Sequence, residues 1–525
     1  MKRHARAASA ALASLLAFAA LASPPASLAE GRDKLLQRAE RELREGNFEE
    51  AEKVFREALS KDKQSDEARL GLSRALLKQR KNQDAFDQAA RVVAQDPLSP
   101  RGHALLGMAL LNSGDFRLSV EEFRTSLSIK GDDAVAVAGL AMVAYHENRL
   151  LEALEGLRRA AFIDPYEPDY LFSLGQVAAR SERYKEAADA YERFLRIAPR
   201  TDTDRRERIR GLIDFLRYLG TQGGLLRPDG PTRNVIPFEL INNRPVLKVR
   251  INNSRETLRF VLDSGAGMCV ISTAAAEKMG LRAVARGGMA RAIGGRFEIV
   301  YGFMQSLHVG DVRVDNVPVY IRKFFNEQEP VDGYVGLTVI SKYLTSVDYG
   351  RREMTMLRGA DVPDYDAKQP PPGVEVPIRV TSSGFWSGEV KFDELEKPSN
   401  FIIDTGASIS VISEALATRL EALDRYAKIT RIKVYGAAGV AEDVQMLNIP
   451  RVHIGPLPQK NVAAAVIDMD AINETSGFEQ TGIVGGNVLR HFRVTFDFER
   501  AVVRLEPLAA ATPDEKPVGV VTSQP

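Results

Sequence analysis

The 525-residue sequence contains a single cysteine, Cys269, and only six histidines. One cysteine excludes an internal disulfide, so the fold must be stabilised by its packed cores. Cys269 lies in an apolar run typical of a buried strand, which disfavours a nucleophilic role for its thiol. The histidines show no HExxH or other metal-ligand spacing, and no G-x-S-x-G motif occurs. The sequence therefore predicts an activity without a metal or another cofactor.

An excess of charge of either sign is also missing. Lysine and arginine together number 71 and aspartate and glutamate 70, which gives a formal net charge of +1. Such a balanced composition gives no overall electrostatic field that would attract nucleic acid or an acidic membrane. We therefore expect no nucleic-acid partner.

Long hydrophobic runs are confined to the N-terminus. Lys2, Arg3 and Arg6 precede an Ala/Leu-rich run over 7–22, and Ser27-Leu28-Ala29 follows it. A basic start, a short apolar run and a small-x-small site predict a secretory signal peptide over 1–29. The alternative is a retained membrane anchor, for which about 16 residues are short. We expect an exported bacterial protein, periplasmic or secreted, without a membrane span in its mature chain.

A 34-residue interval runs through residues 31–201. The positions that keep this interval include Ala51, Ala85, Ser119, Ala153 and Ala187. This period, with segments such as "GNFEEAEKVFREAL", resembles the tetratricopeptide repeat. The resemblance implies an all-α solenoid of about five repeats, followed by a closing helix and linker over 202–232. Its concave face would bind an unidentified protein partner, and a spacer or stabilising cap is the alternative.

The second half of the chain contains two β-rich units that match each other. "FVLDSGAGMCVIS" begins at Phe260, and "FIIDTGASISVIS" begins 141 residues later at Phe401. The match continues downstream, where "DGYVGLTVISKYL" corresponds to "TGIVGGNVLRHF". Short alternating strands and turn residues predict units over 233–358 and 374–508, with a proline-rich linker over 359–373 and a flexible tail over 509–525.

Each unit resembles one lobe of an aspartic protease of the retropepsin/pepsin superfamily. The resemblance implies an all-β bilobal fold in which Asp263 and Asp404 form one catalytic pair. Two facing carboxylates can share one proton, so that one activates water while the other protonates the substrate carbonyl. The resemblance also implies a supporting role for the neighbouring loop residues, with hydroxyls that cross-link the loops and glycines that admit close backbone approach. These residues are Ser264, Gly265, Ala266, Thr405, Gly406 and Ala407.

The sequence thus predicts an aspartic-type endopeptidase acting on peptide or protein substrates, with repeats that recruit the substrate or a partner. The alternative is a catalytically inactive peptide-binding or scaffold protein that keeps the fold. Hairpins around Gly294 and Gly436 are interpreted either as flaps over the substrate or as ordinary surface hairpins. Asp348 and Asp497 are expected to be structural turn residues.

Overall fold

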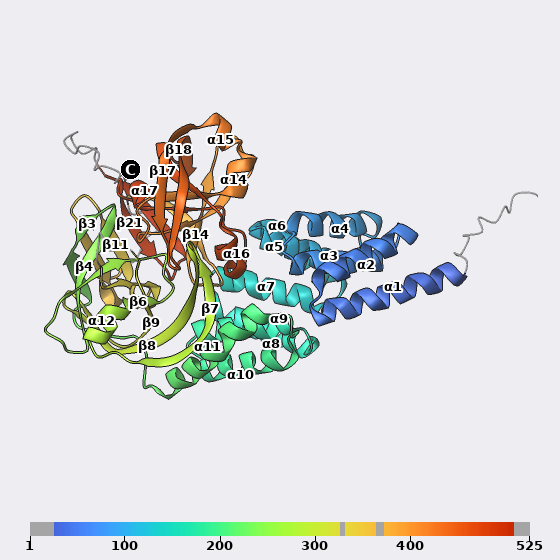
Figure 1. Ribbon diagram of the computed structural model, residues 1–525, viewed down its shortest axis with the longest axis horizontal. Coiled ribbons are helices and arrows are strands. Elements are labelled where there is room, and N and C mark those ends of the chain that lie inside the picture. The colour runs from blue at the N-terminus through green and yellow to red at the C-terminus, as the bar shows by residue number, and fades with distance from the viewer. Residues whose placement is uncertain (1–25, 326–330, 364–371, 509–525) are drawn as a thin grey trace, which may run out of the picture.

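The computed structural model describes residues 26–325, 331–363 and 372–508 (Figure 1), with side chains from residue 33 onward. Residues 1–25 of the predicted signal peptide lie outside the described residues, and its last residues begin the first helix. The predicted tail, 509–525, and residues 364–371 of the predicted linker also lie outside them.

The N-terminal part consists of helices packed in antiparallel pairs, followed by a longer helix, α11 (Thr203–Thr221). The second helices of the pairs begin at Phe48, Asn82, Phe116, Leu150 and Tyr184, which reproduces the 34-residue interval of the sequence. The small residues Ala51, Ala85, Ser119, Ala153 and Ala187 are all fully buried in these helices. The pairs are α1 (Ala26–Glu45) with α2 (Phe48–Lys61), α3 (Asp66–Lys78) with α4 (Asn82–Gln95), α5 (Pro100–Asn112) with α6 (Phe116–Ile129), α7 (Ala134–His146) with α8 (Leu150–Ile163), and α9 (Pro168–Arg180) with α10 (Tyr184–Ile197).

The first β unit, lobe 1, is a curved sheet with the order β1-β9-β6-β10-β5-β4-β8-β7. It includes one strand before the predicted boundary at residue 233, because β1 pairs with β9. Its elements are β1 (Arg227–Asp229), β3 (Glu239–Ile241), β4 (Arg244–Ile251), β5 (Leu258–Leu262), β6 (Cys269–Ser272), α12 (Thr273–Lys278), β7 (Ala283–Ala292), β8 (Gly295–Val309), β9 (Val312–Arg322), β10 (Gly333–Val335) and α13 (Leu337–Ile340).

The second β unit, lobe 2, repeats the central pairings of lobe 1. In both lobes a strand that leads to the acidic turn runs parallel to a short later strand, with Phe260 opposite Gly333 and Phe401 opposite Gly482. The elements of lobe 2 are β14 (Trp386–Lys391), β15 (Ser399–Ile403), β16 (Ser410–Ser413), α14 (Glu414–Arg419), α15 (Ala422–Arg425), β17 (Ala427–Tyr435), β18 (Val440–Ile454), β19 (Leu457–Ile467), α16 (Asp470–Ser476), β20 (Gly482–Val484) and α17 (Gly486–Leu489).

A shared antiparallel sheet joins the two lobes in the order β13-β22-β21-β11-β12-β2. At its centre β11 pairs with β21, and the hydroxyls of Ser346 and Thr495 are 2.6 Å apart. This sheet fixes the lobes relative to each other within one chain. Its strands are β2 (Arg233–Pro237), β11 (Leu344–Asp348), β12 (Glu353–Leu357), β13 (Val374–Val380), β21 (Phe492–Asp497) and β22 (Val502–Pro507), and a short 3₁₀ turn, Gly359–Asp361, follows β12.

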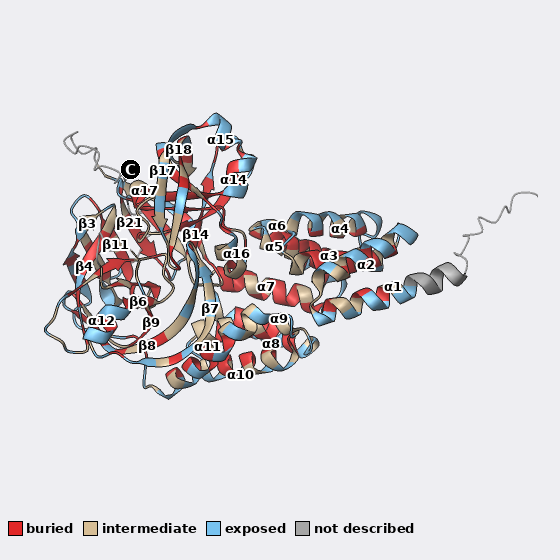
Figure 2. Cartoon of the chain, in the orientation of Figure 1, coloured by how far each residue is buried: buried red, intermediate tan, exposed pale blue. Residues whose placement is uncertain are grey.

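The helices α7, α9 and α11 lie beside the β lobes, whereas α1–α4 project away from them (Figure 1). The largest buried core extends from α7–α11 into both lobes, and smaller separate cores lie among the preceding helices (Figure 2). Among the described residues, none of the helices has both the length and the apolar character needed to cross a bilayer.

Candidate active site

Asp263 and Asp404 lie at the ends of equivalent buried strands. The last three residues of β5 and of β15 are buried and apolar, and each strand is held between two neighbouring strands. The N–H of Asp263 donates to the carbonyl of Val335 at 3.0 Å, and that of Asp404 donates to Val484 at 3.0 Å. The strands therefore hold both carboxylates in matching positions.

The two acidic loops are joined through the hydroxyls of Ser264 and Thr405, as the resemblance implied. The N–H of Ser264 donates to Thr405 Oγ1 at 3.1 Å, and the N–H of Thr405 donates to Ser264 Oγ at 3.0 Å. Each hydroxyl also donates across the lobes, from Ser264 to the carbonyl of Ile403 at 2.8 Å and from Thr405 to that of Leu262 at 2.7 Å. Both side chains are fully buried, so these four bonds form away from water.

Gly265 and Gly406 bring each loop against the carboxylate of the other lobe. A Cβ atom added at Gly265 would lie 2.4 Å from Cγ of Asp404, and one added at Gly406 would lie 2.6 Å from Cγ of Asp263. Such distances leave no room for a side chain at either position. Each glycine N–H also donates to the aspartate of its own loop, at 2.8 Å for Asp263 and 2.7 Å for Asp404.

The alanines that follow these glycines anchor the loops to the element behind them. The carbonyl of Ala266 accepts a hydrogen bond from the N–H of Leu337, the first residue of α13, at 2.8 Å. In lobe 2, the carbonyl of Ala407 accepts from the N–H of Gly486, the first residue of α17, at 2.7 Å. The eight residues selected from the sequence therefore come together in one place.

Burial and mutual repulsion perturb the two carboxyl groups. Removal from water raises the pKa of Asp263 well above its ordinary value, and the negative charge and hydrogen bond of Asp404 raise it further. Burial also raises the pKa of Asp404, but hydrogen bonds from the backbone of Gly406, Ala407 and Gly265 and from Asp263 oppose this shift. The pair as a whole therefore retains one proton above the ordinary aspartate range.

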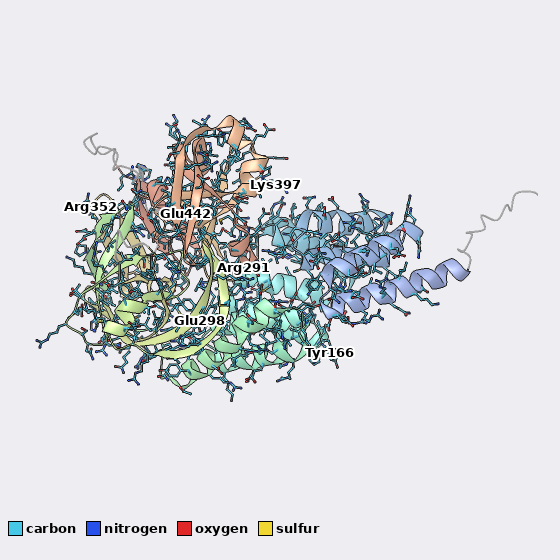
Figure 3. The ribbon with its side chains drawn as sticks, viewed as in Figure 1. Tyr166, Arg291, Glu298, Arg352, Lys397 and Glu442 are labelled. Atoms are coloured by element: carbon cyan, nitrogen blue, oxygen red, sulfur yellow. The ribbon has the colours of Figure 1, made fainter. Side chains whose placement is uncertain are left out.

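Both aspartates line one cleft of about 3130 Å³ between the lobes. The hairpin β7–β8 and the hairpin β17–β18 meet at the wall of this cleft, where the N–H of Ala438 donates to the carbonyl of Ile293 at 3.2 Å. Gly294 and Gly439 are in backbone contact at this junction. Figure 3 shows side chains from both hairpins, with Arg291 on β7 and Glu442 on β18, and both of these residues line the cleft.

Arg322, on β9, is a site residue that sequence reasoning missed. Its Nη1 donates to the carbonyl of Ala437 at the tip of the β17–β18 hairpin, at 2.9 Å. Its guanidinium lies 5.8 Å from the ring centroid of Tyr334, and its positive charge lowers the pKa of Asp263. No motif surrounds Arg322 in the sequence, so only its place in the folded chain reveals it.

The other residues that the sequence analysis considered, two aspartates and the single cysteine, are not part of the Asp263–Asp404 pair. The carboxylates of Asp348 and Asp497 accept from the N–H groups of Arg351 and Arg500 in equivalent hairpin turns, at 2.9 and 3.0 Å, as expected of structural residues. Cys269 is buried in β6, where burial raises the pKa of its thiol to about 11. In the described part of the chain no group of histidine, cysteine, aspartate and glutamate side chains has the arrangement of a metal site.

Comparison with known families agrees with this geometry. An aspartyl protease family model matches residues 247–339 and 388–488. Tetratricopeptide repeat models match residues 42–109, 105–168 and 168–201. The chain therefore contains an aspartyl protease domain in two segments, preceded by tetratricopeptide repeats.

Solved structures resemble the helical part only weakly. A thermophilic tetratricopeptide protein of Thermus thermophilus is 21% identical, with 35% of this chain and 98% of that chain covered and a TM-score of 0.31. PilF of Pseudomonas aeruginosa is 18% identical, with 32% of this chain and 78% of that chain covered and a TM-score of 0.26. MamA of Desulfovibrio magneticus is 23% identical, with 32% of this chain and 94% of that chain covered and a TM-score of 0.24. These alignments are too weak to add to the repeat assignment. The comparison with curated protein sequences found no significant match.

Proposed function

We propose that this chain is an aspartic-type endopeptidase that hydrolyses peptide bonds with Asp263 and Asp404. The observation that carries the proposal is the packing of each carboxylate against the glycine of the opposite loop, with raised pKa values on both. A buried pair that keeps one proton can act as acid and base in the same step. A structural pair of turn residues has no need of this arrangement.

In the proposed reaction, written with the shared proton on Asp263, the Asp404 carboxylate removes a proton from a water molecule while the water oxygen attacks the substrate carbonyl carbon. Asp263 gives its proton to the carbonyl oxygen, which produces a neutral tetrahedral diol. Asp404 then gives its proton to the leaving nitrogen while Asp263 recovers a proton from a diol hydroxyl, and the C–N bond breaks. The pair ends with the single proton with which it began.

The hairpins β7–β8 and β17–β18 would act as flaps that cover the bound peptide. Their tips touch each other and line the cleft that contains both aspartates, which favours this role over that of ordinary surface hairpins. The repeats would bring a protein partner or the substrate itself. From the predicted signal peptide over 1–29 we also propose export to the periplasm or the medium.

The test is incubation of the purified full chain with a diverse peptide library, with products identified by mass spectrometry. We expect internal cleavage that a hydroxyl-bearing transition-state-analogue inhibitor abolishes. Binding of library peptides without any cleavage would instead support the alternative, an inactive peptide-binding protein.

A further inference from the structure

The cleft that contains the two aspartates continues onto the repeat helices. One face of α9 lines it with Phe172, Gln176 and Arg180, and one face of α11 lines it with Arg208 and Leu212. In both helices these residues are spaced by four, so their side chains share a face. At about 3130 Å³ the cleft is several times larger than the roughly 300–1,000 Å³ of small-molecule pockets. A chain of several residues fits such a space better than a small ligand.

The helix α11 is packed directly against the β7–β8 hairpin. A Cβ atom added at Gly211 would lie 2.8 Å from the Gly287 Cα, and one added at Gly288 would lie 2.4 Å from the Arg208 Cα. The rings of Phe215 and Tyr301 stack with their centroids 4.4 Å apart. We call the faces of α9 and α11 that line the cleft the repeat wall. Backbone contact without intervening side chains fixes the position of α11, and with it this wall, against the β7–β8 hairpin.

The helix α7 and its neighbours are anchored to lobe 2 as well. His146 is fully buried, and its Nδ1 lies 2.6 Å from the carbonyl oxygen of Val380. Asn148 Nδ2 donates to the carbonyl of Phe498 at 3.0 Å, and the N–H of Glu479 donates to the carbonyl of Asn112 at 2.8 Å. The repeats are therefore fixed against the protease lobes, which does not fit a loosely tethered spacer.

Two arginines on this wall have no carboxylate partner among the described residues. Arg180 lies over the ring of Trp386, at 5.7 Å from its centroid, and its Nε is buried without a hydrogen-bond acceptor. Arg208 forms no ion pair with any described carboxylate, although it lines the cleft. In contrast, the acids that α9 and the turn after it contribute to the cleft are neutralised, because Asp169 pairs with Lys78 and Arg205 and Glu182 pairs with Lys342. The wall therefore presents uncompensated positive charge to whatever fills the cleft.

From this we infer that α9 and α11 form a substrate subsite: they bind the polypeptide that is being cut, on one side of the scissile bond, and favour acidic side chains there. The repeats would then act on the substrate directly, whether or not a separate partner also binds them. The inference rests on the proposed peptidase function. A substrate carboxylate placed beside Arg208 would gain a charge-assisted hydrogen bond in a partly dry site.

Binding tests the inference without catalysis. Two fluorescein-labelled peptides share an apolar half and carry either glutamate or lysine residues in the other half, and anisotropy is measured with the full-length Asp263→Asn variant. We expect the glutamate peptide to bind about tenfold more tightly, a preference that added salt weakens. Arg208→Glu in the same background should reverse this preference. The control is Arg210→Gln, since Arg210 is exposed on the same helix and does not line the cleft. Equal binding of both peptides, or no change with Arg208→Glu, would overturn the subsite.

Cleavage separates this inference from the proposed function. The shortest peptide that the wild-type chain cleaves is extended at either end with glutamate or with glutamine. An acidic extension at one end should lower KM, and Arg208→Gln should remove that gain while it changes the KM of the short peptide much less. If Arg208→Gln impaired cleavage of the short and the extended peptides equally, Arg208 would have only a structural role. If no library peptide is cleaved although the charge preference in binding persists, the peptidase proposal fails and the repeat wall remains a peptide-binding surface.

Discussion

Replacement of Thr405 with valine removes one hydroxyl from the contact between the lobes and keeps the shape of the side chain. Thr405 is fully buried, accepts the N–H of Ser264 at 3.1 Å and donates to the carbonyl of Leu262 at 2.7 Å. In Thr405→Val both backbone groups lose their partners where water cannot replace them. An unsatisfied buried group costs about 1–3 kcal/mol, so the variant should lose about 2–6 kcal/mol of unfolding free energy.

The matched control is Thr405→Ser, which keeps the hydroxyl and loses one methyl group, at a cost of about 1 kcal/mol. Urea unfolding of both variants can be followed by the fluorescence of Trp386, the only tryptophan of the chain, which is fully buried in β14. We expect the valine variant to unfold at clearly lower urea than the serine variant. Coincident midpoints for the two variants would refute the claim that this hydroxyl holds the lobes together.

Three further predictions concern pH and concentration. Arg322→Met removes a charge that lowers the pKa of Asp263, so the pH profile of kcat/KM should move to higher pH. An unchanged profile would mean that Arg322 does not influence the titration of the two aspartates. Burial lowers the pKa of His146 from 6.5 to about 4, so the wild type should lose about 3 kcal/mol of stability as pH falls from 6.5 towards 4, because the unfolded chain gains the proton first. In urea unfolding, the His146→Phe variant should lose much less unfolding free energy over this pH range. A loss equal to that of the wild type would contradict the attribution of the pH dependence to His146. Because Asp263 and Asp404 belong to one chain, specific activity should stay constant on dilution, and a fall would indicate a site shared between chains.

The sequence was most informative where its signal was local or repeated. The 34-residue interval around Ala51 and Ala85 reflects buried positions in successive helix pairs, so it predicted the helical register directly. The duplicated stretches at Phe260 and Phe401 predicted two similar lobes, and the structure places both in the same register against β10 and β20. Hydrophobic runs before each acidic turn were sufficient to position Asp263 and Asp404 at the ends of buried strands.

Contacts between distant segments could not be predicted in this way. Nothing near Arg322 indicates that it reaches the tip of a hairpin that lies 115 residues later. Similarly, Gly211 and Gly287 look like ordinary glycines in the sequence, yet their backbones touch where α11 meets β7. The strand β1 escaped prediction because three residues show no period and its pairing with β9 is long-range. Such features depend on how whole elements pack together.

The most direct test of the account is peptide cleavage by Asp263→Asn and by Asp404→Asn, each assayed alone against the wild type. Both substitutions are nearly isosteric, so the urea unfolding of Trp386 should still show a folded protein. Because neither carboxyl group can serve as acid and base in the same step, each variant should lose at least roughly 10²–10⁴-fold in kcat/KM. Near wild-type turnover by either folded variant would contradict the shared pair of aspartates.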